Sequence, residues 1–289
     1  MIIVRLKGSM GNQLFQYATG RHLAHLNNAP LFLDTTYFNS SNITTQWKYE
    51  LDAFNIAGSI ATADLLRPFN GCKFSNSDRL KVYLTSFGKY KKFLFEQYGF
   101  NDEVLELRGN YYLKGYYQSE KYFKSIANIL RQELTIKEAF FPKNNTIVNQ
   151  IKNTKSVSIH IRHGDYIRNI SAMDARGLCS KDYYTKSIEY MKRELGDDIH
   201  FYLFTDDENW VKREMQWDID TTLITGNTMM EDFYLMSLCQ NNIISNSTYS
   251  WWAAWLNDFP EKKVVMPKHW GANVKTEDID LNPPKWLTK

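Results

Sequence analysis

The stretch SVSIHIRHGDY, residues 156–166, decides the fold. Apolar residues occupy every second position from 157 to 161, and this period of two indicates a β-strand that ends at the turn dipeptide Gly164-Asp165. His160 and Arg162 therefore emerge side by side at the carboxyl end of a strand, where open α/β sheets bind ligands. A guanidinium can hold a phosphate through two parallel hydrogen bonds. The stretch predicts an anion site, best suited to a sugar nucleotide.

Regular alternation of strands and helices follows this strand. The polar segment 142–155 precedes it and marks a domain boundary, so that we expect domains at 1–145 and 146–289. The expected strands are 156–162, 200–204, 221–224, 242–245 and 264–266, and the expected helices are 184–195, 207–215, 229–239 and 248–257. This alternation is typical of a parallel sheet with helices on both faces.

The amino-terminal half opens with a βαβ pattern. A strand at 2–6, a helix at 12–26 and a strand at 31–33 are joined by the glycine-containing loop KGSMGNQ. Residues 35–108 show no sustained period. A strand is expected at 111–117, and helical spacing runs from Phe123 to Leu134.

Composition excludes several classes of protein. The 289 residues are 43% hydrophobic and 23% charged, which is ordinary for a globular protein, and the net charge of +3 is too small to indicate nucleic acid. No apolar run approaches the ~20 residues of a membrane span, and MIIVRLKG is a first strand and not a signal peptide. Three scattered cysteines suit a reducing compartment. We expect a cytoplasmic protein without a transmembrane segment; peripheral membrane association stays open, and Asn42-Ile43-Thr44 is a chance glycosylation triplet.

A second informative stretch is NNIISNSTYSWWAAWL, residues 241–256. Hydroxyl and amide side chains stand between a short strand and an apolar helix, namely Ser245, Asn246, Ser247 and Thr248. Free amides and the positive end of the helix dipole make such a turn a phosphate cradle. N-capping is the commoner role of these residue types. The Arg162 strand beside them in the same sheet makes phosphate binding more nearly as probable as capping.

Acidic residues offer fewer distinct signals. Asp232, in the first turn of a helix, either complements the helix dipole or accepts two hydrogen bonds from guanine, and the sequence leaves both open. After the strand at 200–204, capping by Thr205 or Asp206 is the expected role. No acid pair has supporting ligands, and His22 and His25 lie on one helix where a structural role is commoner, so no metal is expected.

Three segments together resemble the α1,2-fucosyltransferases. They are MIIVRLKGSMGNQLFQYATGRHLA, HIRHGDY and EDFYLMSLCQNNIISNSTYSWWAAWL, with FTDD between the second and third. The resemblance covers roughly residues 1–260 and is weakest through 35–110. It implies a GT-B fold, with two Rossmann-like domains facing across a cleft, the first on the acceptor side and the second holding GDP-fucose. It also implies inverting transfer to the 2-hydroxyl of a terminal galactose on a glycan, without metal or cofactor.

Residue roles carry over from that resemblance by position. Arg162 resembles the catalytic arginine on the β-phosphate, His160 its nucleotide-contacting neighbour, and Asp232 the guanine-reading acid. The remaining donor-binding residues are Asn246, Ser247 and Thr248 at the helix start, and Met10, Gly11 and Asn12 in the loop over the sugar-phosphate. His163 stands where the family usually has a second arginine, which makes donor binding pH-sensitive if its charge matters. Asp34 is a candidate general base, although a solvated turn acid is the commoner role.

Three alternatives to this function remain. One is another fucosyltransferase linkage on the same fold. A second is a different nucleotide-sugar or phosphate enzyme on that fold, which guanine dependence would separate from a fucosyltransferase. The third is a non-catalytic carbohydrate-binding protein that uses its many aromatic side chains, although Trp251, Trp252 and Trp255 have the helical spacing of buried packing. A binding protein would hold sugar without GDP.

Overall fold

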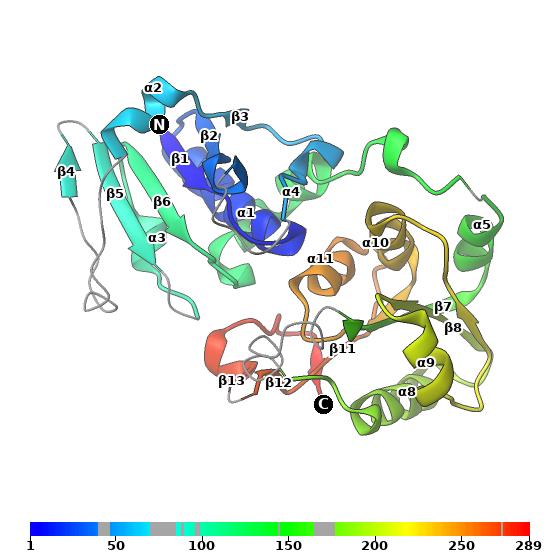
Figure 1. Cartoon of the computed structure of the whole chain (residues 1–289). Helices are drawn as coiled ribbons and strands as arrows, with labels where there is room; N and C mark the ends of the chain where they lie inside the picture. Colours follow the sequence, from blue (N-terminus) through cyan, green and yellow to red (C-terminus); the bar gives the residue numbers. More distant parts are fainter. Residues whose placement is uncertain are drawn as a thin grey trace. The chain divides into compact units, whose positions relative to one another are not determined.

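The chain divides into two compact units. A computed structural model describes residues 1–39, 47–69, 85–87, 90–95, 99–143, 145–164, 177–272 and 274–289 (Figure 1). The end of the predicted turn, Asp165 and Tyr166, and the triplet at 42–44 lie outside these residues. The first unit is Met1–Thr135 with Ile279–Leu281, and the second is Ile136–Asp278 with Asn282–Lys289.

The first unit is built on a six-stranded sheet in the order β3-β2-β1-β6-β5-β4, parallel except for the edge strand β4. Its strands are β1 (Ile2–Arg5), β2 (Leu31–Asp34), β3 (Ser59–Ile60), β4 (Thr85–Phe87), β5 (Tyr90–Phe95) and β6 (Tyr111–Gly115). Its α-helices are α1 (Met10–Leu26), α2 (Ala63–Leu66), α3 (Glu103–Glu106) and α4 (Ala127–Glu133). The βαβ opening is confirmed. A Cβ atom at Gly20 would collide with Val4, so this glycine lets α1 lie directly on the sheet.

The second unit has a six-stranded sheet in the order β14-β11-β10-β7-β8-β9, parallel throughout. Its strands are β7 (Lys155–Ile161), β8 (Ile199–Thr205), β9 (Thr221–Leu223), β10 (Asn241–Ile243), β11 (Val264–Met266) and β14 (Leu287–Thr288). Its α-helices are α5 (Asn145–Asn153), α8 (Lys181–Leu195), α9 (Glu208–Glu214), α10 (Met229–Leu238) and α11 (Thr248–Leu256). Every strand and helix predicted after residue 155 is present, and the α/β class with parallel sheets is confirmed.

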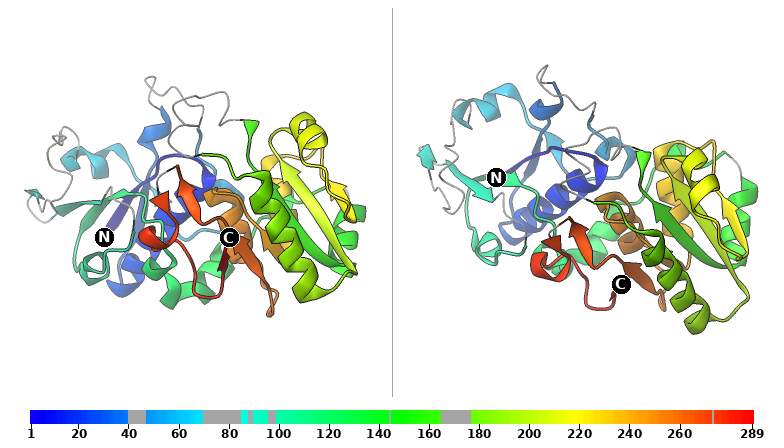
Figure 2. Two further views of the ribbon diagram at one scale, coloured as in Figure 1. Left: turned by 90° about the horizontal axis from the view of Figure 1, so that it is seen from below. Right: turned by 60° about the horizontal axis from the view of Figure 1, so that its bottom comes forward.

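Strand β7 is buried on both faces. Val157 and Ile159 pack with α8 in one apolar core, and Ser158 and His160 on the opposite face are also almost inaccessible. Helices α10 and α11 pack on each other on that opposite face, where the Asn242 side chain bonds both Ser158 and α10 (Figure 2). A central parallel strand covered by helices on both sides explains this burial. The side chains at the end of β7 are therefore rigidly placed.

Two features differ from the sequence-based expectation. The boundary between the units falls after Thr135 and not after residue 145, because the intervening segment packs on the second unit, where Phe141 stacks on Tyr234 at 4.4 Å. An antiparallel hairpin of β12 (His269–Gly271) and β13 (Val274–Lys275), together with β14, was not expected.

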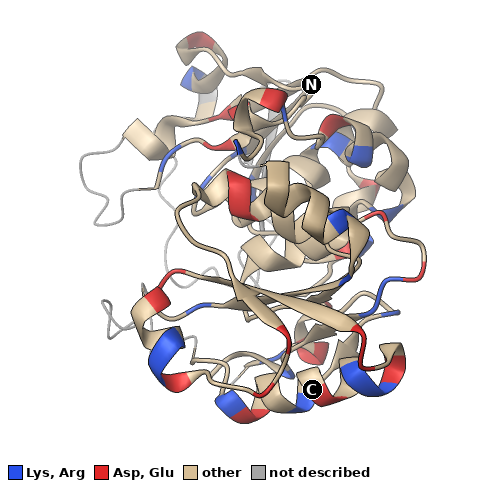
Figure 3. Ribbon diagram, turned by 90° about the vertical axis from the view of Figure 1, so that its right-hand side faces the viewer, with Lys and Arg blue, Asp and Glu red and all other residues tan. Residues whose placement is uncertain are grey.

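Lys, Arg, Asp and Glu are interspersed on the side of the chain seen in Figure 3.

Candidate functional site

An ion pair fixes Arg162 at the carboxyl end of β7. Its Nε atom lies 3.5 Å from Oδ2 of Asp206, which follows β8. The other Asp206 oxygen accepts hydrogen bonds from the backbone amides of His163 (2.8 Å) and Gly164 (3.0 Å). Burial alone would raise the pKa of Asp206, but Arg162 and the two amides hold it below the usual value. Asp206 is therefore ionised and holds both the guanidinium and the turn after β7.

Capping of α9 falls to a neighbour of Asp206. Asp207 is the N-cap and accepts a hydrogen bond from the amide of Trp210 at 3.0 Å, so the prediction of Thr205 or Asp206 as the cap is wrong. Both Asp206 oxygens already serve the β7 turn, and this leaves the capping position to the next acid. Sequence spacing alone did not separate the two adjacent carboxylates.

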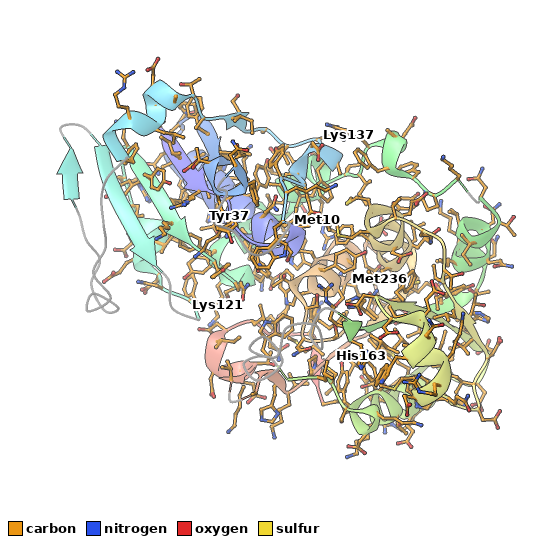
Figure 4. The ribbon with its side chains drawn as sticks, viewed as in Figure 1. Met10, Tyr37, Lys121, Lys137, His163 and Met236 are labelled. Carbon is orange, nitrogen blue, oxygen red and sulfur yellow. The ribbon has the colours of Figure 1, made fainter. Side chains whose placement is uncertain are left out.

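His163 is packed against α9. Its Nδ1 atom lies 2.9 Å from Oδ2 of Asp207, and its ring stacks on Trp210 with centroids 3.8 Å apart (His163 is labelled in Figure 4). The ring is 5% exposed. These contacts give His163 a packing role, and its predicted contribution of charge to donor binding stays a prediction.

His160 joins β7 to the turn before α11. Its Nδ1 atom lies 2.9 Å from Oγ of Ser245, and its backbone carbonyl accepts a hydrogen bond from the Tyr184 hydroxyl. Burial is the main cause that lowers the pKa of His160, and the nearby charge of Arg162 lowers it further. The imidazole is therefore neutral at physiological pH.

The start of α11 has the features of an anion cradle. Ser247 occupies the N-cap position but its side chain makes no capping hydrogen bond, so the expected capping role is not the one it plays. Ser247 and Thr248 are each 9% exposed. The positive end of this nine-residue helix lies at the same sheet edge as Arg162, because β10 pairs with β7 in parallel.

Asn246, in the same turn, is engaged with the protein. Its Nδ2 atom donates to the carbonyl oxygens of Gly177 (3.0 Å) and Trp270 (3.4 Å), and its Oδ1 atom accepts from the Cys179 thiol. It also lines a cavity of about 470 Å³ beside the start of α8. The side chain thus ties three segments together, and its predicted contact with the donor stays a prediction.

Asp232 lies in the first turn of α10 but does not cap it. Thr228 and Glu231 form a complete capping box there. Asp232 Oδ1 accepts a hydrogen bond from Nδ2 of Asn227 at 2.9 Å. Burial raises the pKa of Asp232 to about 6; the Asn227 bond lowers it, and Glu231 and Glu208 raise it further. A half-buried carboxyl with a raised pKa that no cap requires is typical of a ligand-binding group.

Tyr249 connects these parts and was not identified from the sequence. Its hydroxyl donates to the backbone oxygen of Met229 at 2.5 Å, at the start of α10. Its ring lies 5.4 Å from the rings of both His160 and Phe233. The only sequence signal was a hydroxyl-bearing aromatic in the first turn of α11, next to apolar residues that indicate packing.

In the first unit, the loop residues Met10, Gly11 and Asn12 form the first turn of α1 (Met10 is labelled in Figure 4). Asn12 accepts a hydrogen bond from Gln118 at 2.7 Å. Inaccessible Gln13 binds Gly8 O, Lys48 O and the amide of Glu50, at 2.9, 2.8 and 3.0 Å. The turn is therefore well anchored, and its predicted contact with a donor sugar stays a prediction.

Asp34 is buried. The expectation that it would be a solvated acid in a turn is therefore wrong. Asp34 is 3% exposed, and its oxygens accept hydrogen bonds from the Tyr112 hydroxyl and from the amide and hydroxyl of Thr36. The turn after β2 folds back over the carboxylate, which explains the burial. With three donors already bound, Asp34 is poorly suited to take a proton as general base.

The described residues contain neither a metal-binding cluster nor a membrane-spanning helix. No group of three His, Cys, Asp or Glu side chains there is placed to share a metal ion, and no helix there has the length and apolar run needed to cross a bilayer. His22 uses both ring nitrogens, toward Tyr122 O and Ser125 Oγ. That pairing is the structural role expected of it.

The whole chain matches one family. The model of glycosyl transferase family 11 matches residues 1–288. Two Escherichia coli proteins are similar over nearly their full length: an alpha-1,2-colitosyltransferase (32% identity, 99% of this chain and 98% of that one) and the O-antigen biosynthesis glycosyltransferase WbnK (35%, 98% of each). The Mus musculus galactoside 2-alpha-L-fucosyltransferase Sec1 is 21% identical over 89% of this chain and 64% of its own.

The fold also has relatives among solved structures. A FUT1 mutant from Arabidopsis thaliana in complex with GDP matches with a TM-score of 0.55 at 12% identity, over 98% of this chain and 74% of that one. The parallel α/β units described above are those of the GT-B fold, which is confirmed. The chain belongs to glycosyl transferase family 11, a family of GT-B glycosyltransferases.

Proposed function

We propose that this glycosyltransferase moves L-fucose from GDP-fucose to the 2-hydroxyl of a terminal galactose, with inversion at the anomeric carbon. Membership of family 11 and the similarity to Sec1, named a galactoside 2-alpha-L-fucosyltransferase, support the reaction class. The similarity to two E. coli glycosyltransferases, one of them named for O-antigen biosynthesis, supports a glycan acceptor and a bacterial-type enzyme. A cytoplasmic location is part of the same proposal.

One observation carries the proposal: groups suited to guanine, phosphate and the leaving charge converge in one unit. Tyr249 links the start of α10, where Asp232 lies, to His160 on β7. The His160–Ser245 bond then links β7 to the start of α11. These bonds hold together three groups in the second unit. Asp232 can bind the guanine base, the start of α11 can bind phosphate oxygens, and Arg162 can bind the β-phosphate.

The chemistry follows from these groups. The acceptor's O2 forms a bond to C1 of fucose while the bond from C1 to the β-phosphate oxygen breaks, and GDP leaves with the electron pair. Negative charge grows on that phosphate, where Arg162 and the amides of α11 would stabilise it without a metal ion. Removing one such group typically reduces the rate by about 10²–10³. The acceptor proton passes to a base or to the departing phosphate.

A second donor deserves a parallel assay, because a relative of 32% identity is named a colitosyltransferase. Colitose is fucose without its 3-hydroxyl. Both donors carry GDP, so the nucleotide site described here does not separate them. A sugar pocket that hydrogen-bonds the 3-hydroxyl would reject the deoxy sugar strongly, since the partner group would be left unpaired.

The test is transfer from each donor to a β-galactoside in EDTA, with GDP release measured and the linkage determined by NMR. We expect a 2-linked product from GDP-fucose, loss of activity in Arg162→Ala, and normal activity in Arg193→Ala, whose side chain is 65% exposed on α8. Transfer from GDP-colitose and not from GDP-fucose would show that colitose, and not fucose, is the sugar transferred. Transfer to another hydroxyl would refute the linkage, and no transfer from either donor would refute the function.

A further inference from the structure

We propose that Ser245 sets the tautomer of His160, so that a neutral imidazole donates a hydrogen bond from Nε2–H to a phosphate oxygen of the bound nucleotide. Ser245 is thus a positioning residue. The ligand contact rests on the proposed nucleotide site, whereas the tautomer itself does not depend on it.

The direction of the Ser245–His160 bond follows from counting donors. Ser245 is fully buried, and within the described part of the chain its hydroxyl has one partner, Nδ1 of His160 at 2.9 Å. If Nδ1 carried the proton and donated it, the hydroxyl hydrogen would have no acceptor. A buried donor without a partner is costly, so the hydroxyl donates and Nδ1 accepts. The ring proton is then on Nε2.

The Nε2 atom is the open end of this pair. Among the described residues it has no hydrogen-bond partner, and it is not one of the described polar atoms that are both unpartnered and closed off from solvent. The rest of the ring is covered, since His160 is 4% exposed and its ring packs near Tyr249. Nε2–H is therefore the polar group of the ring that is left to meet a ligand.

The surroundings keep the ring uncharged. The charged groups that act on it are Arg162, which opposes a second positive charge, and Asp206, which favours one. Asp206 is already engaged by Arg162 and by two backbone amides. A neutral imidazole gives a directed donor whose strength does not change with pH, beside the full charge of Arg162. His160 thus supplies a directed hydrogen bond, and Arg162 supplies the positive charge.

The first test reads the tautomer directly in the free protein. Long-range ¹H–¹⁵N NMR of protein labelled at its six histidines distinguishes Nδ1–H from Nε2–H, and His160→Gln assigns the signal by its loss. We expect a proton on Nε2, an unprotonated Nδ1, and no protonation of the ring between pH 5.5 and 8. A proton on Nδ1, or a ring that charges in this range, would overturn the proposal. Neither result bears on whether GDP is the ligand.

The second test uses two amides that mimic opposite ring nitrogens. The glutamine amide reaches the place of Nε2, whereas the asparagine amide matches Nδ1. We expect GDP affinity of His160→Gln within about 3-fold of wild type and that of His160→Asn reduced on the order of 10- to 100-fold, the strength of a hydrogen bond to a charged group. Ser245→Ala should lose roughly 2- to 10-fold, since the ring keeps its donor but loses its orientation.

His200→Gln serves as the matched control, because His200 bonds Asp220 and Thr222 at the other end of β8 and should leave GDP affinity unchanged. Equal affinities of His160→Gln and His160→Asn would overturn the ligand contact. Failure of wild-type protein to bind GDP would instead refute the proposed function, with the tautomer still decided by NMR.

Discussion

Replacing Asp232 with asparagine should stabilise the second unit while it weakens GDP binding. The pKa of Asp232 is raised from 3.8 to about 6, so an environment that favours the protonated form holds an ionised carboxylate at neutral pH. Because the folded pKa lies above the unfolded one, this destabilisation is absent below the unfolded pKa and complete above the folded pKa. The shift corresponds to roughly 3 kcal/mol, and since asparagine can still accept the Asn227 bond we expect a gain of about 1–3 kcal/mol in unfolding free energy at pH 7.5.

The same carboxyl makes GDP binding pH-dependent with a defined sign. Only the ionised form can accept hydrogen bonds from both N–H groups of guanine, so GDP affinity should rise with pH through about 6. Between pH 5 and pH 7.5 the gain is roughly tenfold. A protonated His163 that contributed charge would produce the opposite trend. Asp232→Asn should remove the pH dependence and weaken GDP on the order of 10- to 100-fold.

Calorimetry from pH 5 to 8 in EDTA measures the affinity, and thermal and urea unfolding measure the stability. Asp182→Asn, which changes an exposed acid on α8, is the matched control. It should leave GDP affinity unchanged and, through loss of the Lys186 pair, lower the unfolding free energy only slightly. The reasoning is refuted if Asp232→Asn is no more stable than wild type, or if wild-type affinity is flat or falls as pH rises.

Three further substitutions test the supports of the site. Asp206→Asn removes the charge that holds Arg162. We expect GDP affinity to fall about tenfold by calorimetry, and the unfolding free energy to fall by about 1 kcal/mol by urea titration, since this ion pair is partly exposed. Tyr249→Phe loses the bond to Met229 but keeps the ring; GDP should weaken by roughly 2- to 10-fold, and an unchanged affinity would argue against that link. Gln13→Ala breaks three hydrogen bonds of a fully buried side chain and should lower the unfolding free energy by about 2–4 kcal/mol in urea. An unchanged unfolding free energy would argue against an anchored turn.

Much of the second unit was predictable because its strands and helices are local and periodic. The alternation after residue 155 reports burial, and burial follows directly from apolar spacing. Contacts between distant segments leave no such trace. The bond from Ser245 to His160 spans 85 positions, and no local pattern in either segment predicts it.

The same limit explains the missed site residues. Tyr249 bonds Met229 across 20 positions, and its aromatic ring suggests only packing. Asn227 bonds Asp232 five positions away, and its amide suggests only an ordinary loop residue. Asp34 was misjudged because the turn after β2 folds back over it. The return of Ile279–Leu281 to the first unit is likewise a tertiary event, since Ser119 holds Asp280 across 161 positions.

A guanine-selective diphosphate site built on Arg162 would bind GDP without metal, and calorimetry with GDP, UDP and ADP in EDTA measures this binding. We predict that wild-type protein binds GDP selectively, that Arg162→Ala weakens GDP on the order of 10- to 100-fold, and that Arg193→Ala binds as wild type. Absence of GDP binding, equal affinity for the three nucleotides, or unchanged affinity in Arg162→Ala would show that the protein has no such site.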